Sequence, residues 1–162
     1  MRLFSAVVAC SLLVACGGGT EAAPELTSAD RSGIQAEVLD WSDQWLENGT
    51  NLDAQGVALL FDEADGHFVD GGQYQASWQE FLTHSQQLYR GWESWEGSWG
   101  ARRIDVLADD AALLVGQMES VITDDEGVES DVQTTFSFVL RKKEGVWKAL
   151  FGHVGGVWTP KQ

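Results

Sequence analysis

The chain of 162 residues contains little cysteine and little positive charge. Its only two cysteines are Cys10 and Cys16, so a chain cleaved ahead of Cys16 could form no internal disulfide and would depend on a packed core. The chain has ten Lys and Arg residues and 25 Asp and Glu residues, which gives a net charge of −15. So acidic a surface repels phosphate backbones and anionic lipid headgroups, and nucleic acid is therefore not expected as a partner. A cationic ligand or partner would be favoured.

Long hydrophobic runs are also missing. The apolar run at residues 3–15 is too short for a bilayer, which takes roughly 20 residues, but with Arg2 ahead of it the run looks like a secretory signal peptide. The run ends in LVAC at Cys16, which resembles the lipobox of bacterial lipoproteins. That resemblance implies removal of residues 1–15 and lipidation of Cys16. VVAC at Cys10 also fits but leaves a shorter apolar run. Plain secretion and a buried first helix are the alternatives, and three glycines after Cys16 disfavour the helix.

Residues 16–32 are rich in Gly, Ala, Ser and Thr and show no hydrophobic period. They predict a flexible tether with an average span of roughly 20 to 24 Å. Residues 33–162 then form a single domain. A lipid on Cys16 would anchor this domain to the membrane of the cell envelope. In a Gram-negative organism the expected place is the periplasmic face of the outer membrane, because Gly17 replaces the aspartate that retains lipoproteins at the inner membrane.

Hydrophobic periodicity predicts helices first and strands afterwards. Apolar residues from Ile34 to Trp45 share one helical stripe, with Ser28 or Asp30 as the N-cap and the sequence ENGT at residues 47–50 as the end. Further elements are predicted as helices at 53–60 and 77–89, a short strand HFVDGG at 67–72, and period-two strands at 92–107, 111–123, 131–143 and 146–158. Three helices packed on one face of a curved antiparallel sheet make an α+β fold.

Three pieces of this order carry a resemblance to a known family. They are LLFDEA at residues 59–64, FVDGG at 68–72 and the terminal GVWKALFGHVG at 145–155. Their sequence is similar to the nuclear transport factor 2 (NTF2)-like superfamily, in particular its SnoaL-like and DUF4440-like members. The resemblance implies a cone with a pocket between sheet and helices, often dimeric through the sheet. It leaves the function open among isomerases, cyclases, dehydratases, ligand binders and interaction modules.

Asp70 ends the first predicted strand, where ketosteroid isomerase and the polyketide cyclases of this superfamily carry a catalytic carboxylate. The resemblance makes it a candidate general base, with His153 of the terminal strand as a candidate partner. Asp70 can instead cap the DGGQ turn, and His153 can be structural. Isomerase chemistry is disfavoured, because the places of its enolate-oxygen donors fall near Trp41 or Ser42 and near Ser137, which lack the required groups.

Two other histidines remain. His67 is a candidate ligand-binding residue, but it lies three positions before Asp70 and therefore on the opposite face of a regular strand. His84 is expected at the surface of the third helix. The sequence has no HExxH or two-histidine spacing, so neither a metal nor another cofactor is expected.

Trp92, Trp95 and Trp99 lie in the segment GWESWEGSWG. Their spacings of three and four do not fit one face of a regular strand, so the segment either contains a bulge or exposes some of these rings. Together with Tyr89 they are candidates for binding an apolar or cationic ligand at a pocket mouth. Ordinary sheet packing is the alternative.

The sequence favours an exported lipoprotein whose cone binds a small apolar ligand or a partner protein without catalysis. The alternative is an acid/base enzyme of the polyketide cyclase, dehydratase or isomerase type that uses Asp70 with His153. Convergence of these two side chains inside a closed cone would favour the enzyme. A homodimer through the sheet is compatible with either function.

Overall fold

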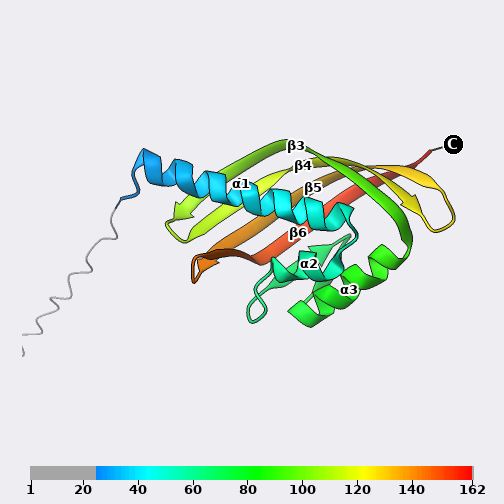
Figure 1. The fold of residues 1–162 in the computed structure, drawn as a ribbon, viewed down its shortest axis with the longest axis horizontal. Coiled ribbons are helices and arrows are strands. Elements are labelled where there is room, and N and C mark those ends of the chain that lie inside the picture. The colour runs from blue at the N-terminus through cyan, green and yellow to red at the C-terminus, as the bar shows by residue number, and fades with distance from the viewer. Residues whose placement is uncertain (1–24, 162) are drawn as a thin grey trace, which may run out of the picture.

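The computed structural model describes residues 25–161. The expected signal peptide, Cys16 and most of the expected tether lie outside these residues. The described chain forms three helices and six strands (Figure 1). The elements are α1 (Ser28–Thr50), α2 (Ala54–Leu59), β1 (His67–Asp70), β2 (Gln73–Gln75), α3 (Trp78–Arg90), β3 (Trp92–Ala108), β4 (Ala111–Asp124), β5 (Glu129–Lys143) and β6 (Val146–Pro160).

Helix α1 begins earlier than the sequence analysis expected. Its N-cap is Thr27, whose hydroxyl accepts a hydrogen bond from the Asp30 backbone N–H at 3.2 Å. The Asp30 carboxylate in turn accepts the Thr27 backbone N–H at 2.9 Å. This reciprocal pair is a capping box, so the predicted caps Ser28 and Asp30 were wrong. Residues 28–32 belong to the helix and not to the tether.

Helix α1 ends at Thr50, within the predicted ENGT segment, but Gly49 does not cap it and lies buried in its last turn. A Cβ atom at Gly49 would lie 2.1 Å from Cζ3 of Trp95, which no real contact permits. The glycine is therefore required by the close approach of the Trp95 ring. Asn51 caps the C-terminus of the helix, and Leu52 follows it with a positive φ of 55°.

The strands form one six-stranded sheet in the order β2-β1-β6-β5-β4-β3. Neighbours are antiparallel except β1 and β6, which run parallel, so the sheet is mixed and not antiparallel throughout. The four long strands lie within two residues of their predicted bounds. Strand β2 was not predicted, because its three residues are too few for a period-two pattern.

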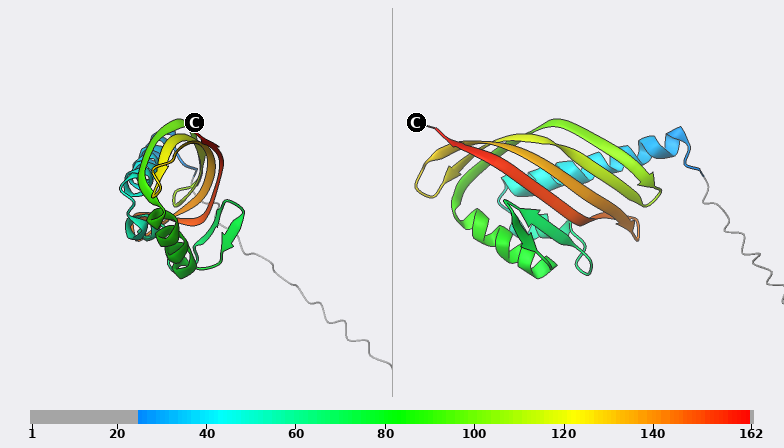
Figure 2. Two further views of the ribbon diagram at one scale, coloured as in Figure 1. Left: turned by 90° about the vertical axis from the view of Figure 1, so that its right-hand side faces the viewer. Right: turned by 180° about the vertical axis from the view of Figure 1, so that it is seen from behind.

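Strand β3 curves the sheet. Its pairing with β4 shifts register at three places, between Trp92 and Ser94, between Trp99 and Arg102, and between Val106 and Ala108, and each time β3 holds one residue more than β4. Such bulges bend a strand and increase its twist. Figure 2 shows the result, a sheet that curls strongly when viewed along its length. The helices pack on its concave side, which confirms the expected α+β cone.

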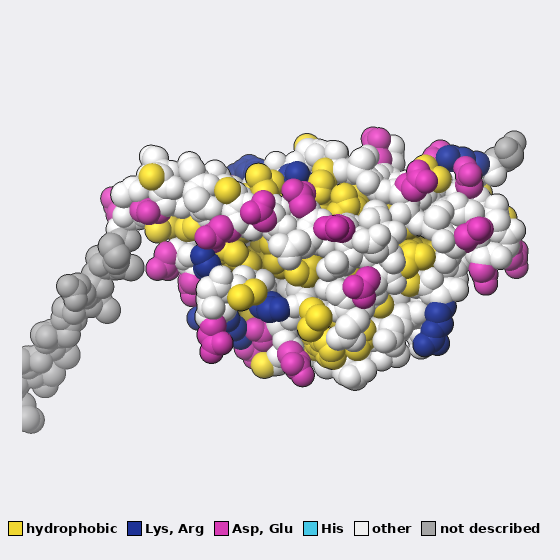
Figure 3. Space-filling model, in the orientation of Figure 1, with side chains coloured by type: hydrophobic (Ala, Val, Ile, Leu, Met, Phe, Trp, Pro, Cys, Tyr) yellow, Lys and Arg dark blue, Asp and Glu magenta, His cyan; other side chains and the backbone are white. Residues whose placement is uncertain are grey.

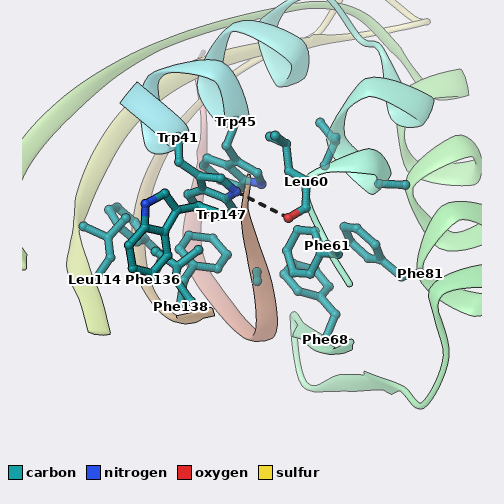
Figure 4. Close-up of a cluster of buried hydrophobic side chains, with 14 of the residues drawn as sticks. Trp41, Trp45, Leu60, Phe61, Phe68, Phe81, Leu114, Phe136, Phe138 and Trp147 are labelled. Carbon is teal, nitrogen blue, oxygen red and sulfur yellow. Dashed lines mark hydrogen bonds between the residues drawn. The ribbon is translucent and has the colours of Figure 1, made fainter. Parts of the chain in front are cut away.

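Aromatic side chains join α1 to the sheet (Figure 4). The Trp41 and Trp45 rings meet Phe138 of β5 edge-on, with centroid distances of 5.2 and 5.3 Å. Trp41 also lies 6.4 Å from Phe61, and its indole N–H donates to the Leu60 carbonyl oxygen at 3.3 Å. Such edge-to-face pairs add roughly 0.5–1.5 kcal/mol each beyond the area they bury. They fix α1 across the concave face.

A second group of aromatic side chains packs β1 and α3 against each other. Phe68 of β1 packs against Phe61 and Phe81, with centroids at 5.3 and 4.3 Å. Gly152 on β6 makes room for this group, since a Cβ there would lie 2.6 Å from the Phe68 ring and 2.9 Å from the Phe61 ring. The two groups share Phe61 and form one continuous core.

Acidic side chains are spread over the molecular face shown in Figure 3, with few basic ones among them. None of the helices within residues 25–161 is both long and apolar enough to cross a membrane.

Substitution of alanine for either of two glycines in α1 should change the stability in opposite directions. Gly49→Ala should lower the free energy of unfolding by about 1–3 kcal/mol, because overpacking against the buried Trp95 ring outweighs the gain in helix propensity. Gly33→Ala should raise it by up to about 1 kcal/mol, since nothing lies within 4 Å of the added methyl group. Urea unfolding of both variants measures this. Equal effects would contradict the close approach of Trp95.

Candidate functional site

A cavity of about 250 Å³ lies between the concave face of the sheet and helix α3. For comparison, an apolar cavity of roughly 150 Å³ accommodates benzene. Most of the wall is apolar, and the polar groups on it are few. The lining includes Trp45, Asp70, His84, Tyr89, Trp92, Trp95, Ser120 and Trp158.

A larger hollow of about 520 Å³ lies on the outer face of the sheet. Its lining is mainly polar and includes Glu96, Glu119 and Asp131. We place the candidate site in the smaller cavity, because a largely apolar pocket with a few convergent polar groups is the usual form of a small-molecule site.

The cavity wall holds an aspartate–histidine pair. Nε2 of His84 on α3 lies 3.0 Å from Oδ2 of Asp70, the last residue of β1. Both side chains are largely buried, with exposed fractions of 21% for His84 and 25% for Asp70. A hydrogen bond of this kind fixes the orientation of the imidazole.

The pair corrects two expectations. His84 does not lie free on the surface. The Asp70 carboxylate is bound to His84 rather than to the turn that follows, in which Gly71 and Gly72 have φ values of 53° and 83°. The sequence did contain a signal, because His84 follows the buried Phe81 by three positions and so shares its helix face.

His153 and His67 do not meet Asp70. The register pairs Asp70 with Val154, and His153 with Val69, so His153 points to the opposite face of the sheet. It is exposed there. His67 also lies on that outer face, where its Nδ1 is 3.4 Å from the Tyr74 hydroxyl. His153 is therefore not placed to act with Asp70, as the alternative enzyme function required.

Of the two alternatives for the tryptophan segment, the bulge is confirmed. Trp92 pairs with Asp124 and Ser94 with Thr123, so Glu93 is the extra residue. The insertion turns the Trp92 side chain toward the face of Trp95, and the two rings lie 5.7 Å apart.

Aromatic rings from three elements close one end of the cavity. Tyr89 of α3 packs on Trp92 and Trp95, with centroids at 5.4 and 6.2 Å. Trp92 also reaches Trp158 of β6 at 5.9 Å, although two strands separate β3 from β6 in the sheet. The curvature of the sheet brings these two rings together. Trp158 is 48% exposed, so this end faces solvent.

Trp99 lies away from the cavity lining. Its ring stacks on Trp45 at 5.9 Å, and its indole N–H donates to the Asp43 carboxylate at 2.9 Å. The Arg102 guanidinium lies over the ring, 4.9 Å from the centroid, and bonds Asp43. Trp99 therefore fastens β3 to α1.

The Tyr89 hydroxyl stays protonated. Burial, together with the negative charges of Asp70 and Asp53, raises the pKa of Tyr89 well above its ordinary value. A neutral phenol on the cavity wall can donate a hydrogen bond to a ligand.

No group of three or more His, Cys, Asp or Glu residues is placed to hold a metal ion anywhere in residues 25–161.

Comparison with known proteins agrees with this architecture. The sequence profile of the SnoaL-like domain matches residues 38–155, which is most of the chain. The chain belongs to this family. No curated protein matches it in sequence. Membership of this family accounts for the fold. The chemistry of the site depends on the residues that line the cavity.

Several solved structures share the fold. A hexachlorocyclohexane dehydrochlorinase from Novosphingobium barchaimii is 14% identical with a TM-score of 0.73, over 83% of this chain and 94% of the other. A protein assigned as a scytalone dehydratase from Novosphingobium aromaticivorans is 10% identical with a TM-score of 0.77, over 84% and 93%. A protein assigned as a calcium/calmodulin-dependent protein kinase II association domain from Xanthomonas campestris is 23% identical with a TM-score of 0.64, over 82% and 93%.

The pair on the cavity wall predicts a measurable coupling. In a double-mutant cycle of Asp70→Asn and His84→Gln at neutral pH, the coupling free energy of unfolding should be about 0.5–1.5 kcal/mol, because the hydrogen bond is largely buried. The cycle of His67→Gln and Tyr74→Phe is the control. That contact is exposed and 3.4 Å long, so its coupling should stay below about 0.5 kcal/mol. Equal couplings would argue against the Asp70–His84 bond.

Proposed function

We propose that the SnoaL-like domain is an acid/base enzyme that removes a proton from a carbon atom of a small, mostly apolar substrate. His84 is the base, and Asp70 orients it. The observation that carries this proposal is the 3.0 Å contact between these side chains on the wall of a largely apolar cavity of about 250 Å³.

The protonation pattern follows from the contact. When the Nε2–H of His84 donates to Asp70 Oδ2, Nδ1 carries the lone pair and can accept a proton. The carboxylate then stabilises the imidazolium that forms. In an elimination the electron pair of the broken C–H bond becomes the new C=C bond. The leaving group departs from the adjacent carbon with its bonding electrons, and the proton stays on His84.

Two of the similar structures support this reaction class. One is named as a dehydrochlorinase and one is assigned as a dehydratase, and both names describe eliminations. At 10–14% identity the likeness is one of fold, and the main support for the proposal is the Asp70–His84 pair on the cavity wall.

Deuterium exchange tests the base directly. With 2-tetralone, a bicyclic ketone, in deuterated buffer, the wild-type protein should speed exchange at the carbons beside the carbonyl, and His84→Gln should slow this exchange by roughly 10²- to 10⁴-fold. His67→Gln, on the outer face, should leave it unchanged. Mass spectrometry measures the exchange. Equal rates for the wild-type protein and His84→Gln would contradict the proposal.

Ligand binding without catalysis is the second candidate. The Asp70–His84 bond links the end of β1 to α3, which is a structural role in itself. This function is supported if 2-tetralone binds with the same affinity to the wild-type protein and His84→Gln while neither speeds the exchange.

We further propose that the domain is carried at the cell envelope by a lipid on Cys16. The support is the LVAC sequence behind a short apolar run and the polar segment that follows it. Such an anchor would keep the cavity close to the membrane in which apolar compounds accumulate.

Fatty-acid labelling tests the anchor. Cys16→Ser should abolish incorporation of a radioactive fatty acid and leave an unprocessed or soluble protein, because the acylated thiol is gone. Cys10→Ser should still be labelled and processed. Label retained in Cys16→Ser would reject the assignment.

A further inference from the structure

A large aromatic side chain at the cavity mouth lies outside the core. Trp158 is 48% exposed, and the buried core of residues 25–161 does not include it. Its ring lies on the cavity wall, 5.9 Å from the ring of Trp92, and the two ring planes are inclined by 48°. Much of the Trp158 side chain is therefore open to a ligand that enters the cavity.

Carboxylates surround this mouth. Trp92 pairs with Asp124 across β3 and β4, and residues directly opposite each other have Cβ atoms roughly 4.5–5.5 Å apart. The next residue, Asp125, donates its backbone N–H to the Gly91 carbonyl at 3.1 Å. Glu93 is the bulged residue beside Trp92. Within residues 25–161, none of these three mouth acids forms a salt bridge. Several acidic side chains lie at this end of the molecule in Figure 3.

The basic residues of the same end are engaged elsewhere. Lys161 bonds Glu129 and Asp131 at 3.2 and 3.1 Å. Arg90, the last residue of α3, is exposed and lines a separate hollow beside the start of α2. The residues that line the cavity include no Lys or Arg. The mouth is therefore both aromatic and negative.

We propose that Trp158 and Trp92 bind an alkylated ammonium group of the ligand at the cavity mouth. A cation within about 6 Å of the centroid of a tryptophan ring is attracted by the negative charge of the ring face. The mouth acids attract the same group over a longer range. Alkyl groups on the nitrogen suit this site, because they contact aromatic surface without the need for a hydrogen-bond acceptor.

This inference rests on the proposed function and describes its substrate more closely. His84 lies five residues before Tyr89 on α3, which is about 7.5 Å along the helix axis. Asp70 pairs with Val154, which lies four residues before Trp158 on β6, about 13 Å along the strand. A ligand that reaches both places has its reacting C–H bond roughly 7 to 13 Å from the ammonium nitrogen. The substrate class is a mostly apolar carbon acid with an ammonium group at its far end.

Two matched probes test the ammonium site. 6-(Trimethylammoniomethyl)-2-tetralone carries the cation, and 6-neopentyl-2-tetralone has the same shape with carbon in place of nitrogen. By calorimetric titration, the wild-type protein should bind the cationic probe more tightly. Trp158→Leu removes the aromatic face and keeps an apolar side chain, so it should weaken binding of the cationic probe by about 2- to 30-fold and affect the neutral probe less. Equal losses for the two probes, or no preference in the wild-type protein, would overturn the proposal.

Two further variants control for the loss of a ring. Trp158→Phe keeps an aromatic face and should retain part of the preference for the cationic probe. Tyr74→Leu removes a ring that is 61% exposed on β2 and does not line the cavity, so it should leave both affinities unchanged. A loss of the preference in Tyr74→Leu would contradict a site at the mouth.

The contribution of the mouth acids is tested with paired substitutions. Glu93→Gln combined with Asp125→Asn should weaken binding of the cationic probe and make it less sensitive to salt, while the affinity of the neutral probe stays the same. Asp109→Asn combined with Glu144→Gln changes the net charge equally, in turns at the opposite end of the sheet (Figure 1), and should have little effect. Equal effects of the two pairs would contradict local attraction at the mouth.

The two probes also separate this inference from the proposed function. If both probes bind alike and both exchange deuterium in a reaction that depends on His84, the ammonium site fails and the proposed function stands. If neither probe binds, both proposals fail.

Discussion

The edge-on packing of Trp41 and Trp45 against β5 is the contact on which the rest of the structure depends. It holds one long helix across a strongly curved sheet, and the space left beyond Trp45 becomes the cavity. The same Trp45 ring stacks on Trp99, so the position of β3 is set by the same side chain. The packing of the core and the shape of the cavity therefore depend on the same aromatic side chains, so neither can change without the other.

Positive charge is scarce in this chain, and much of it holds secondary-structure elements together. Lys142 bonds the Glu37 carboxylate at 2.6 Å, and Lys143 bonds Asp62 at 2.6 Å, which ties the end of β5 to α1 and to the segment after α2. These lysines hold the pKa of Glu37 and of Asp62 below its usual value. A carboxyl group whose pKa is lower in the folded than in the unfolded protein stabilises the fold at pH values above its unfolded pKa. This stabilisation is lost as the pH falls through the folded pKa. The acidic surface thus coexists with a few well-placed cations.

The sequence predicted the fold well because its long elements carry strong periods. The period of two located the four long strands to within two residues, and the helical stripe that includes Val38 and Trp45 located α1. Strand β2 was too short to leave a pattern. The parallel pairing of β1 with β6 depends on contacts far apart in the chain, which no local pattern records. The capping box has a sequence signature in Thr27 and Asp30, but the predicted caps lay one and three residues after Thr27.

The site was predicted less completely. The predicted residues Asp70, Tyr89, Trp92 and Trp95 do line the cavity. They could be predicted because each stands next to a turn or at an irregular spacing that marks special geometry. His84 was missed, because the buried Phe81 marks the inner face of α3 but does not reveal that the Asp70 carboxylate lies opposite that face. The unpartnered indole nitrogens of Trp45 and Trp95 and the Ser120 hydroxyl, within residues 25–161, could not be predicted either. Whether a buried polar atom has a partner is decided by tertiary contacts alone.

Because of the bulge at Glu93, the width of the cavity mouth depends on the number of residues in β3 as well as on their side chains. One extra residue places Trp92 on the inner face, where it meets both Tyr89 and Trp158. A strand one residue shorter at this point would point the same tryptophan outward and leave the mouth open. Relatives could therefore change the size of ligand they admit by a single deletion or insertion, with every aromatic residue retained.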